Sequence, residues 1–334
     1  VNFGVADTVE RWWLRLRTGR RSPAPPVTPV LAPVLFVPVA ALHTAPAFPR
    51  HPTRTLRVLA VQGNIPQMRR WSQEQLDLAL DVYTRLTRQT APATQPDLVV
   101  WPETALPAPL LWDEQVRNAL ADLFGKLDSP LLAGTVDYRF PPNPEPDSEP
   151  LAFNSALLFA ADGRVIERYD KIHLVPVGEY TPLENLWPWL PKLIGMGRSL
   201  TPGSEFTVLP LPAGAKTGVN ICYEDVFPAI SRQFVRRGAN VLMTLTNDAW
   251  YAESAGSRQH MVHAIFRAVE NRRPLFRSGN NSDTCLIHPD GRVTGLIADP
   301  ETGNRFVRAA GTFEIPVADN LEMPFYTRFG DVFA

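Results

Sequence analysis

Short apolar runs alternate with amphipathic helix patterns from residue 55 onward, and this alternation constrains the fold more than any other feature of the chain. The run TLRVLAVQGN, at 55–64, has the apolar content of a buried strand. In the next segment, 72–89, apolar side chains recur at helical spacing: Leu76, Leu80, Tyr83 and Leu86. A strand followed by a helix that covers it is the repeating unit of layered α/β domains.

The same pattern continues to the C-terminal third of the chain. Further strands are predicted at DLVVWPE, LLAGTVDY, GVNICYE and NVLMTLTN, and further helices at 116–127, 227–237 and 259–272. Two segments, FNSALLFAADGRVIERYDK and TCLIHPDGRVTGLI, predict hairpins that turn at Asp162-Gly163 and Asp290-Gly291. No internal repeat is visible. The sequence therefore predicts an α/β domain whose sheets carry helices on their outer faces.

A segment without charged side chains precedes this domain. Residues 27–48 would span about 33 Å as a helix, enough to cross a hydrocarbon core of about 30 Å. The basic flank 11–21 contains five arginines and two tryptophans, and the positive-inside rule places such a flank in the cytoplasm. Four prolines within 27–48 favour the alternative, a disordered proline-rich linker. We expect three parts: a membrane-associated segment 1–54, a catalytic domain 55–320, and a tail 321–334 leading to a further membrane helix.

Charge and cysteine content narrow the class of protein. The chain has 33 basic and 34 acidic side chains, a near-neutral balance that excludes nucleic acid as a partner, because phosphate binding needs a basic face. Two cysteines, Cys222 and Cys285, are too few for a disulfide scaffold, and Cys285 is expected in the core. Because the first residue is Val1, we expect a fragment that starts inside a longer protein.

Three polar side chains follow predicted buried strands: Glu103, Lys171 and Cys222. Strand ends are where α/β domains build their sites. A thiol with a pKa of about 8.5 is a poor nucleophile until a base or a cation produces the thiolate. Glu103 would accept the proton, and Lys171 would stabilise the negative charge on an attacked carbonyl oxygen. The alternative is a packed cysteine beside a structural Glu103–Lys171 ion pair.

The sequence motifs around these residues, and the order in which they occur, resemble the nitrilase superfamily of carbon-nitrogen hydrolases. They are WPETALP, DKIHLVPVGEYTP, ICYEDVFP and TNDAWY followed by QHMVHAIFRAVENRRP, and the resemblance extends over about 55–316. It places the family's nucleophile on Cys222, its base on Glu103 and its lysine on Lys171. It also implies a nitrilase-like four-layer α-β-β-α sandwich, here preceded by a partial membrane segment.

Within that superfamily, the chain resembles the branch of apolipoprotein N-acyltransferases. The branch's opening strand and tryptophan resemble VQGNIPQMRRW, which ends at Trp71. Glu179, Tyr223 and Glu224 match supporting or substrate-binding positions of the branch. The segment 27–48 and the motif PFYTRFGD at 324–331 resemble its membrane connections. Two departures are the absence of the branch's earlier spans and GNNSD at 279–283 where the branch often reads TNNG.

The resemblance implies a two-step acyl transfer at the bacterial inner membrane, with the catalytic domain on the periplasmic side. A phospholipid would donate an acyl chain to Cys222, and the N-terminal amine of a diacylglyceryl-cysteine apolipoprotein would accept it. No metal or organic cofactor is implied. An amidase or nitrilase that uses the same three residues is the first alternative. A catalytically silent, membrane-anchored binding domain is the second.

Several other features of the sequence allow more than one interpretation. The loop LENLWPWLPKLIGMG, at 183–197, suits a membrane interface or an acyl-chain lid as well as an ordinary loop folded against the domain. His260 and His263 lie one helical turn apart, and we expect a structural helix there rather than a metal site. His173 is expected to face away from Cys222. Three residues after the last strand motif are expected to shape the pocket: Asn247, Asp248 and Trp250.

Overall fold

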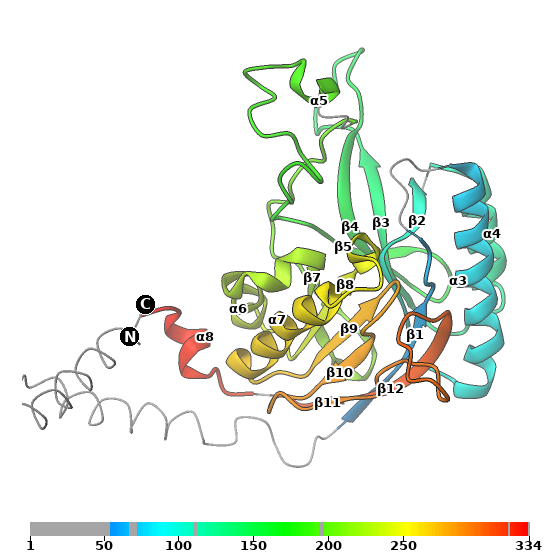
Figure 1. Ribbon diagram of the computed structural model, residues 1–334, viewed down its shortest axis with the longest axis vertical. Helices are drawn as coiled ribbons and strands as arrows, with labels where there is room; N and C mark the ends of the chain where they lie inside the picture. The colour runs from blue at the N-terminus through cyan, green and yellow to red at the C-terminus, as the bar shows by residue number, and fades with distance from the viewer. Residues whose placement is uncertain (1–53, 67–71, 110–111, 194–196, 320, 333–334) are drawn as a thin grey trace, which may run out of the picture.

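The computed structural model describes residues 54–66, 72–109, 112–193, 197–319 and 321–332, which form two packed sheets flanked by helices (Figure 1). The predicted basic flank, the candidate span 27–48 and Trp71 lie outside these residues. Within the described ranges, none of the helices combines the length and apolar character needed to cross a membrane.

Each sheet has six strands. The first runs in the order β12 (Ala309–Val317), β1 (Arg54–Gln62), β2 (Leu98–Pro109), β3 (Leu131–Arg139), β4 (Leu151–Phe159) and β5 (Val165–Asp170). The second runs in the order β11 (Val293–Thr294), β10 (Cys285–Ile287), β9 (Leu275–Gly279), β8 (Val241–Thr246), β7 (Lys216–Ile221) and β6 (Val208–Pro210).

Both sheets follow one plan although the sequence shows no repeat. Strands β1, β2 and β3 are parallel, and so are β7, β8 and β9. An antiparallel strand borders each trio on one side, β12 or β6, and an antiparallel pair continues it on the other. The carboxyl ends of two parallel trios are therefore available for a site.

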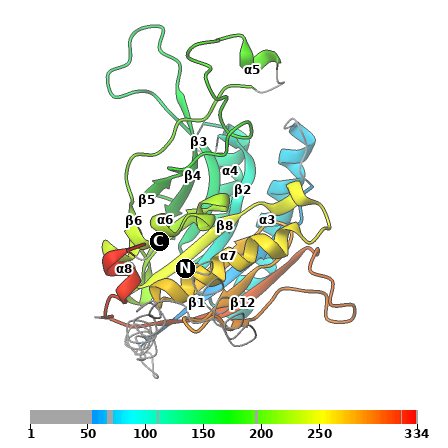
Figure 2. The same cartoon turned by 60° about the vertical axis from the view of Figure 1, so that its left-hand side comes forward.

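Side-chain alternation along the strands explains the layers. In β1, Val58 and Ala60 belong to the core between the two sheets, whereas Leu59 and Val61 belong to the core under the helices. Helices α3 (Gln73–Thr94) and α4 (Glu114–Phe124) cover the outer face of the first sheet, and α6 (Pro228–Arg236) and α7 (Gly256–Asn271) cover that of the second (Figure 2). The predicted α-β-β-α sandwich is thus confirmed.

Local sequence signals explain where the elements begin and turn. The Ser72 hydroxyl accepts a hydrogen bond from the backbone N–H of Gln75 and caps α3 at its predicted start. Both predicted hairpins are confirmed, because Gly163 and Gly291 adopt positive φ angles of 83° and 86° at their turns.

Three sequence expectations need correction. The first helix extends past residue 89 to Thr94, because Pro92 lies in its last turn, where a missing N–H removes only one hydrogen bond. The strand predicted at GVNICYE ends at Ile221, and Cys222 begins a 3-10 turn, η2 (Cys222–Val226). Strands β9 and β12 were not among the predicted elements.

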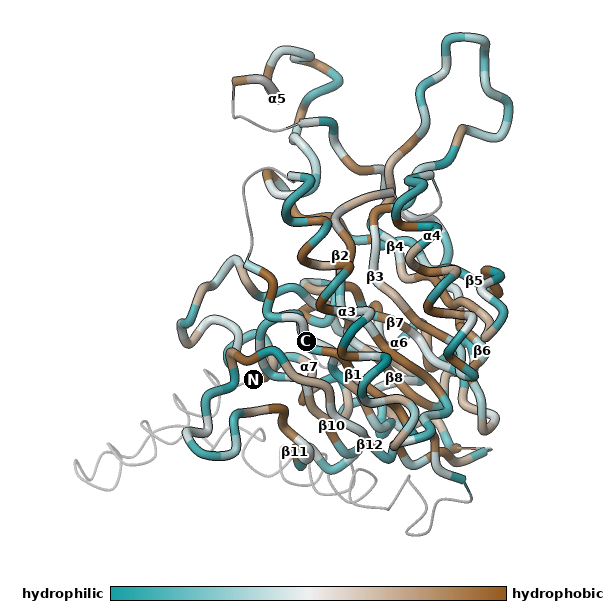
Figure 3. The backbone as a smooth tube through the Cα atoms, turned by 90° about the vertical axis from the view of Figure 1, so that its right-hand side faces the viewer, coloured by the Kyte–Doolittle hydropathy of each residue, from teal (hydrophilic) through white to brown (hydrophobic). Residues whose placement is uncertain are grey.

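A segment of the chain extends away from one end of the sandwich. The loop after Glu179, with the short helix α5 (Leu190–Leu193), projects beyond the strands in Figures 1 and 3. Its large apolar side chains are mostly in solvent: Leu186 is 68% exposed, Trp187 47%, Trp189 57% and Leu193 71%. In its described residues, the apolar loop predicted at 183–197 is therefore largely uncovered by the domain.

The C-terminal tail of the described chain packs on the second helical layer. Helix α8 (Phe325–Phe329) contacts α6 and α7, and the Thr327 hydroxyl donates a hydrogen bond of 3.0 Å to Asn271 Oδ1. The guanidinium of Arg232 also donates to backbone carbonyls of this helix.

Candidate active site

The three residues expected at strand ends come together between the two sheets. Lys171 directly follows β5 and Cys222 directly follows β7. Cys222 has a φ angle of 51°, a left-handed conformation that a non-glycine residue adopts only where the surrounding structure enforces it. This sharp turn lifts the thiol off the end of the strand.

Glu103 differs from the expectation, because it lies within β2 and not after it. The parallel pairing of β2 with β3 is regular up to Trp101 and resumes at Leu106 after a register shift. Gly134 of β3 lies beneath this irregular stretch, and a Cβ atom at Gly134 would approach the Pro102 carbonyl oxygen to 2.5 Å and Glu103 Cα to 2.6 Å. The missing side chain of Gly134 therefore permits the backbone path that presents Glu103.

Two carboxylates share one ammonium group. Lys171 Nζ donates a hydrogen bond of 2.9 Å to Glu179 and lies 3.5 Å from Glu103 Oε1. The Asn154 amide bridges the same carboxylates, at 2.9 Å to Glu103 and 2.7 Å to Glu179. The backbone N–H of Asn247 donates to the other Glu103 oxygen at 2.9 Å. The carboxylate of Glu103 is thus fixed by donors from three separate segments.

The charges around the thiol set its resting state. Burial, followed by the negative charge of Glu103, raises the pKa of the Cys222 thiol well above its usual range, while Lys171 opposes the rise. Burial alone would lower the pKa of Lys171, but Glu103, Cys222 and Glu179 together raise it. The site therefore rests as a neutral thiol beside an ionised lysine, and the thiol has to lose its proton when it reacts.

The two residues after Cys222 have different environments. Glu224 is fully buried and accepts hydrogen bonds from the backbone N–H groups of Ile172 and His173, at 2.8 and 3.1 Å, so it fixes the chain on the C-terminal side of Lys171. Burial raises the pKa of Glu224 to about 7, against the opposing hydrogen bond from the Ile221 N–H. Tyr223 is exposed, and its ring meets that of Phe227 edge-on at 5.5 Å.

A second buried cluster lies on the other side of the nucleophile. His260 is held between Asp248, 2.8 Å from Nδ1, and Asp225, 3.0 Å from Nε2, and Arg277 contacts both carboxylates. Burial alone would lower the pKa of His260, but the two carboxylates raise it to about 9.

Two residues of this cluster, together with Cys222, could be considered as metal ligands. Cys222, Asp248 and His260 each offer a ligand atom within 4.8 Å of the others. A protonated imidazole has no lone pair for a metal, and the ring of His260 lies at ion-pair distance from two carboxylates, so these residues fit an ion-pair cluster better than a metal site. His260 has the structural position expected for it. His173 is exposed, and its ring centroid lies 3.8 Å from that of Phe227.

The loop GNNSD at 279–283 contributes Asn280, which helps to position the residues around Glu103. The Asn280 amide oxygen accepts hydrogen bonds from the Ile65 N–H and the Tyr83 hydroxyl, and its nitrogen donates to Asn247 Oδ1 at 3.0 Å. Asn280 thus connects the loop after β1 to the residue whose backbone holds Glu103. The same loop contains Asp283, a buried carboxylate that pairs with Arg305.

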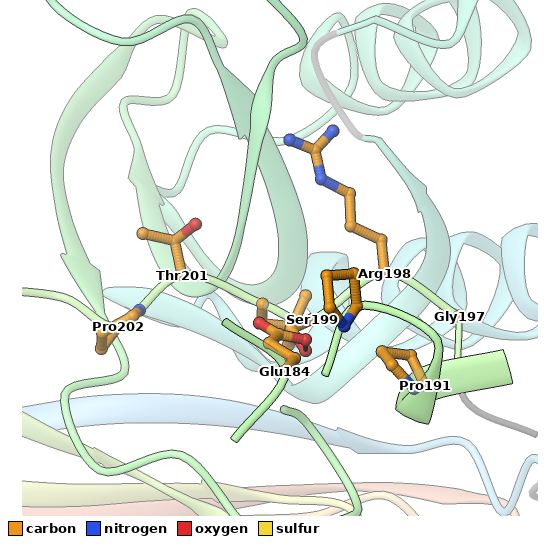
Figure 4. A pocket seen from close by; sticks show the side chains of 9 residues that line it. Glu184, Pro191, Gly197, Arg198, Ser199, Thr201 and Pro202 are labelled. Carbon is orange, nitrogen blue, oxygen red and sulfur yellow. Dashed lines mark hydrogen bonds between the residues drawn. The ribbon is translucent and has the colours of Figure 1, made fainter. Parts of the chain in front are cut away.

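A hollow of about 740 Å³ lies at the base of the projecting loop (Figure 4). Its lining residues lie at positions 184, 188, 191 and 197–202, and they include Glu184, Ser199 and Thr201. This wall is tied to the site, because the Leu200 N–H donates to the Glu179 carbonyl at 2.8 Å and the Thr201 N–H donates to the Ala152 carbonyl at 2.7 Å.

Sequence reasoning missed three residues of this site: Gly134, Asn154 and Asn280. A signal for Asn154 was available, since a polar side chain within the apolar run FNSALLF needs a buried partner. The roles of Gly134 and Asn280 depend on contacts between segments far apart in the sequence. Trp71, the remaining predicted site residue, lies outside the described residues.

The carbon-nitrogen hydrolase family profile matches residues 57–305, and the chain belongs to this family. It is similar to the apolipoprotein N-acyltransferase of Geobacter metallireducens, 35% identical over 321 residues that cover 94% of this chain and 58% of that protein. It is also similar to apolipoprotein N-acyltransferase 1 of Treponema pallidum, 37% identical over 212 residues that cover 59% of this chain and 39% of that protein. The chain thus spans little more than half of the first relative and less of the second.

Solved structures with the same fold include enzymes of the nitrilase superfamily. An amidase from Nesterenkonia AN1 has a TM-score of 0.54 at 19% identity and covers 80% of this chain and 92% of that chain. Saccharomyces cerevisiae Nit3 has a TM-score of 0.54 at 18% identity and covers 79% of this chain and 91% of that chain. At this identity the likeness establishes the fold alone.

Proposed function

We propose that this chain carries the catalytic domain of an apolipoprotein N-acyltransferase. One observation carries the proposal: Glu103, Lys171 and Glu179 form a single charged cluster, in which Glu103 and Lys171 act on the Cys222 thiol, in a chain that is 35% identical to such an enzyme. A neutral thiol beside a carboxylate and an ammonium group suits general-base activation at the moment of attack.

In the first step, Cys222 Sγ attacks the ester carbonyl carbon of a phospholipid while its proton passes to Glu103. The C–O bond of the ester then breaks, the lysophospholipid leaves with a proton, and a thioester remains on Cys222. Lys171 stabilises the oxyanion of the tetrahedral intermediate, with Glu179 and Glu224 holding the lysine and its backbone in place.

In the second step, the free amine of a diacylglyceryl-cysteine N-terminus attacks the thioester. The amine loses a proton to Glu103, the C–S bond breaks, and the thiol of Cys222 is restored. Both steps use the same base and share one thioester intermediate, and the lysophospholipid leaves before the amine attacks, so the proposal predicts ping-pong kinetics. Tyr223 and Trp71 are assigned to the acyl pocket or its entrance.

The projecting loop supports a substrate that is drawn from a membrane. Exposure of large apolar side chains to water does not stabilise a domain, whereas such side chains bind the interfacial region of a bilayer. The exposed side chains of the loop are Leu186, Trp187, Trp189 and Leu193. We assign the loop to the bilayer surface and the catalytic domain to the periplasmic side of the inner membrane. Trp187→Ser with Trp189→Ser should weaken sedimentation with phosphatidylglycerol vesicles, whereas Phe140→Ser, an equally exposed aromatic change outside this loop, should not.

An amidase that uses the same three residues is the second candidate, because the family profile that matches the chain is that of carbon-nitrogen hydrolases, and it would use water in place of the amine. The deciding experiment gives the chain, in detergent micelles, a phospholipid and a diacylglyceryl-cysteine peptide, or a small aliphatic amide such as butyramide. Acylation of the peptide by the wild type, lost in Cys222→Ser, supports the transferase. Hydrolysis of the amide without any peptide acylation would replace the proposal with the amidase.

A further inference from the structure

The register of the second sheet places a hydroxyl beside the nucleophile. Strands β7 and β8 are parallel, with Ile221 opposite Leu245. Cys222 directly follows Ile221 and begins η2, and Thr246 directly follows Leu245 and ends β8, so both residues lie at the carboxyl ends of neighbouring strands. Thr246 is fully buried, and its hydroxyl donates a hydrogen bond of 3.0 Å to Asp248 Oδ1. Cys222 Sγ lies within 4.8 Å of a carboxylate oxygen of Asp248, so the Thr246 hydroxyl and the thiol face the same carboxylate, and the hydroxyl lowers the pKa of the thiol.

Asp248 does not depend on this hydrogen bond. Its Oδ1 also contacts His260 Nδ1 at 2.8 Å, and its Oδ2 forms a close ion pair with Arg277. With Asp225 on the far side of His260, the cluster contains two carboxylates and two cations, and their formal charges cancel. The carboxylate of Asp248 therefore remains paired if the Thr246 hydroxyl turns away from it.

We propose that Thr246 is a further catalytic residue, whose hydroxyl donates to Asp248 in the resting enzyme and turns to donate to the Cys222 thiolate when the thiol is deprotonated. The S–H proton passes to Glu103, and the new negative charge on sulfur accepts the hydrogen of Thr246 Oγ1. Once the sulfur lone pair forms the bond to the acyl carbon, the hydroxyl returns to Asp248. The inference rests on the proposed function only in taking Cys222 as the nucleophile.

Other charged groups also act on the thiol and must stay constant in any test. Glu103 reaches it from β2, and Lys171 from the segment after β5. Asp248 faces it from η3 (Asp248–Tyr251), and the pKa of Tyr251 in the same turn is raised by burial and by the charge of Cys222. Variants at Thr246 leave all of these groups in place.

The test is the pH dependence of Cys222 alkylation by iodoacetamide, followed by peptide mapping, which requires no acyl transfer. Thr246→Val keeps the shape and removes the hydroxyl. It should raise the alkylation midpoint by about one pH unit, which makes labelling about tenfold slower below the midpoint. Thr246→Ser should restore the wild-type profile. Thr246→Ala, which does not add an apolar methyl group, should share the shift of the valine variant and guards against misfolding of the latter.

Thr244 supplies a matched control on the same strand. It is fully buried like Thr246, and its hydroxyl has no hydrogen-bond partner among the described residues. Thr244→Val should leave the alkylation profile unchanged. A folded Thr246→Val or Thr246→Ala that titrates like the wild type would overturn the inference. Failure of the wild type to form an acyl adduct would count against the proposed function and leave this comparison intact.

Discussion

Gly134→Ala tests whether one missing side chain positions the base. The added Cβ would lie 2.5 Å from the Pro102 carbonyl oxygen and 2.6 Å from Glu103 Cα, against an ordinary contact of about 3.5 Å. Relief needs a displacement of about 1 Å between two central strands, and a misplacement of that size can cost about 100-fold in rate. We expect acylation of Cys222 by phospholipid micelles to slow by about 100-fold in single-turnover intact-mass measurements. Overpacking of the core should cost about 1–3 kcal/mol of unfolding free energy.

Gly125→Ala is the matched control. Gly125 ends α4 with a φ angle of −63°, and a Cβ there would meet nothing closer than 3.5 Å. This variant should fold with equal or slightly greater stability and acylate at the wild-type rate. If a well-folded Gly134→Ala also acylates at the wild-type rate, the bulge at Glu103 does not position the base.

Three further predictions concern the groups around the site. Asn154→Ala removes the amide that bridges the two carboxylates and should slow acylation at least tenfold without a change in the chain's fold, as checked by circular dichroism. His260 holds its proton more tightly in the folded chain, with a pKa of about 9 against about 6.5 unfolded. Its contribution of about 3 kcal/mol is therefore present below pH 6.5 and lost as the pH rises through 9, and urea unfolding should show a slope that His260→Gln lacks. Both thiols have raised pKa values, but Cys285 is fully buried whereas Cys222 is partly exposed and has Glu103 as a base beside it. Iodoacetamide at pH 8 should therefore label Cys222 and leave Cys285 unlabelled until the chain is denatured.

Patterns within short segments predicted most of the fold. Apolar periodicity located the strands and helices of both halves, and Asp-Gly turns located both hairpins, because these signals depend on neighbouring residues. Strand β9 was not predicted because Arg277 interrupts its apolar run. This arginine can be buried because it pairs with two carboxylates from other segments. Strand β12 was not predicted because its position in the sheet depends on pairing with β1, about 250 residues earlier in the chain.

In the candidate site, too, local sequence signals could be read, whereas contacts between distant segments could not. Glu103 and Cys222 were predicted because each follows an apolar run, and Lys171 because it ends a predicted hairpin; all three occur in ordered motifs. The positive φ angle of Cys222 and the register shift at Glu103 could not be predicted, since both are imposed by contacts with other strands. The same holds for Thr246, which becomes a neighbour of the thiol only through the parallel register of two strands.

The central claim is that Cys222 carries an acyl group derived from phospholipid. Intact-protein mass spectrometry after incubation of the chain with phospholipid in detergent micelles tests it directly, with Cys222→Ala as the control. The account predicts an added mass of one fatty acyl group that hydroxylamine removes and that the alanine variant lacks. An adduct that persists in Cys222→Ala, or a wild-type chain that reacts with small amides and never with phospholipid, would contradict it.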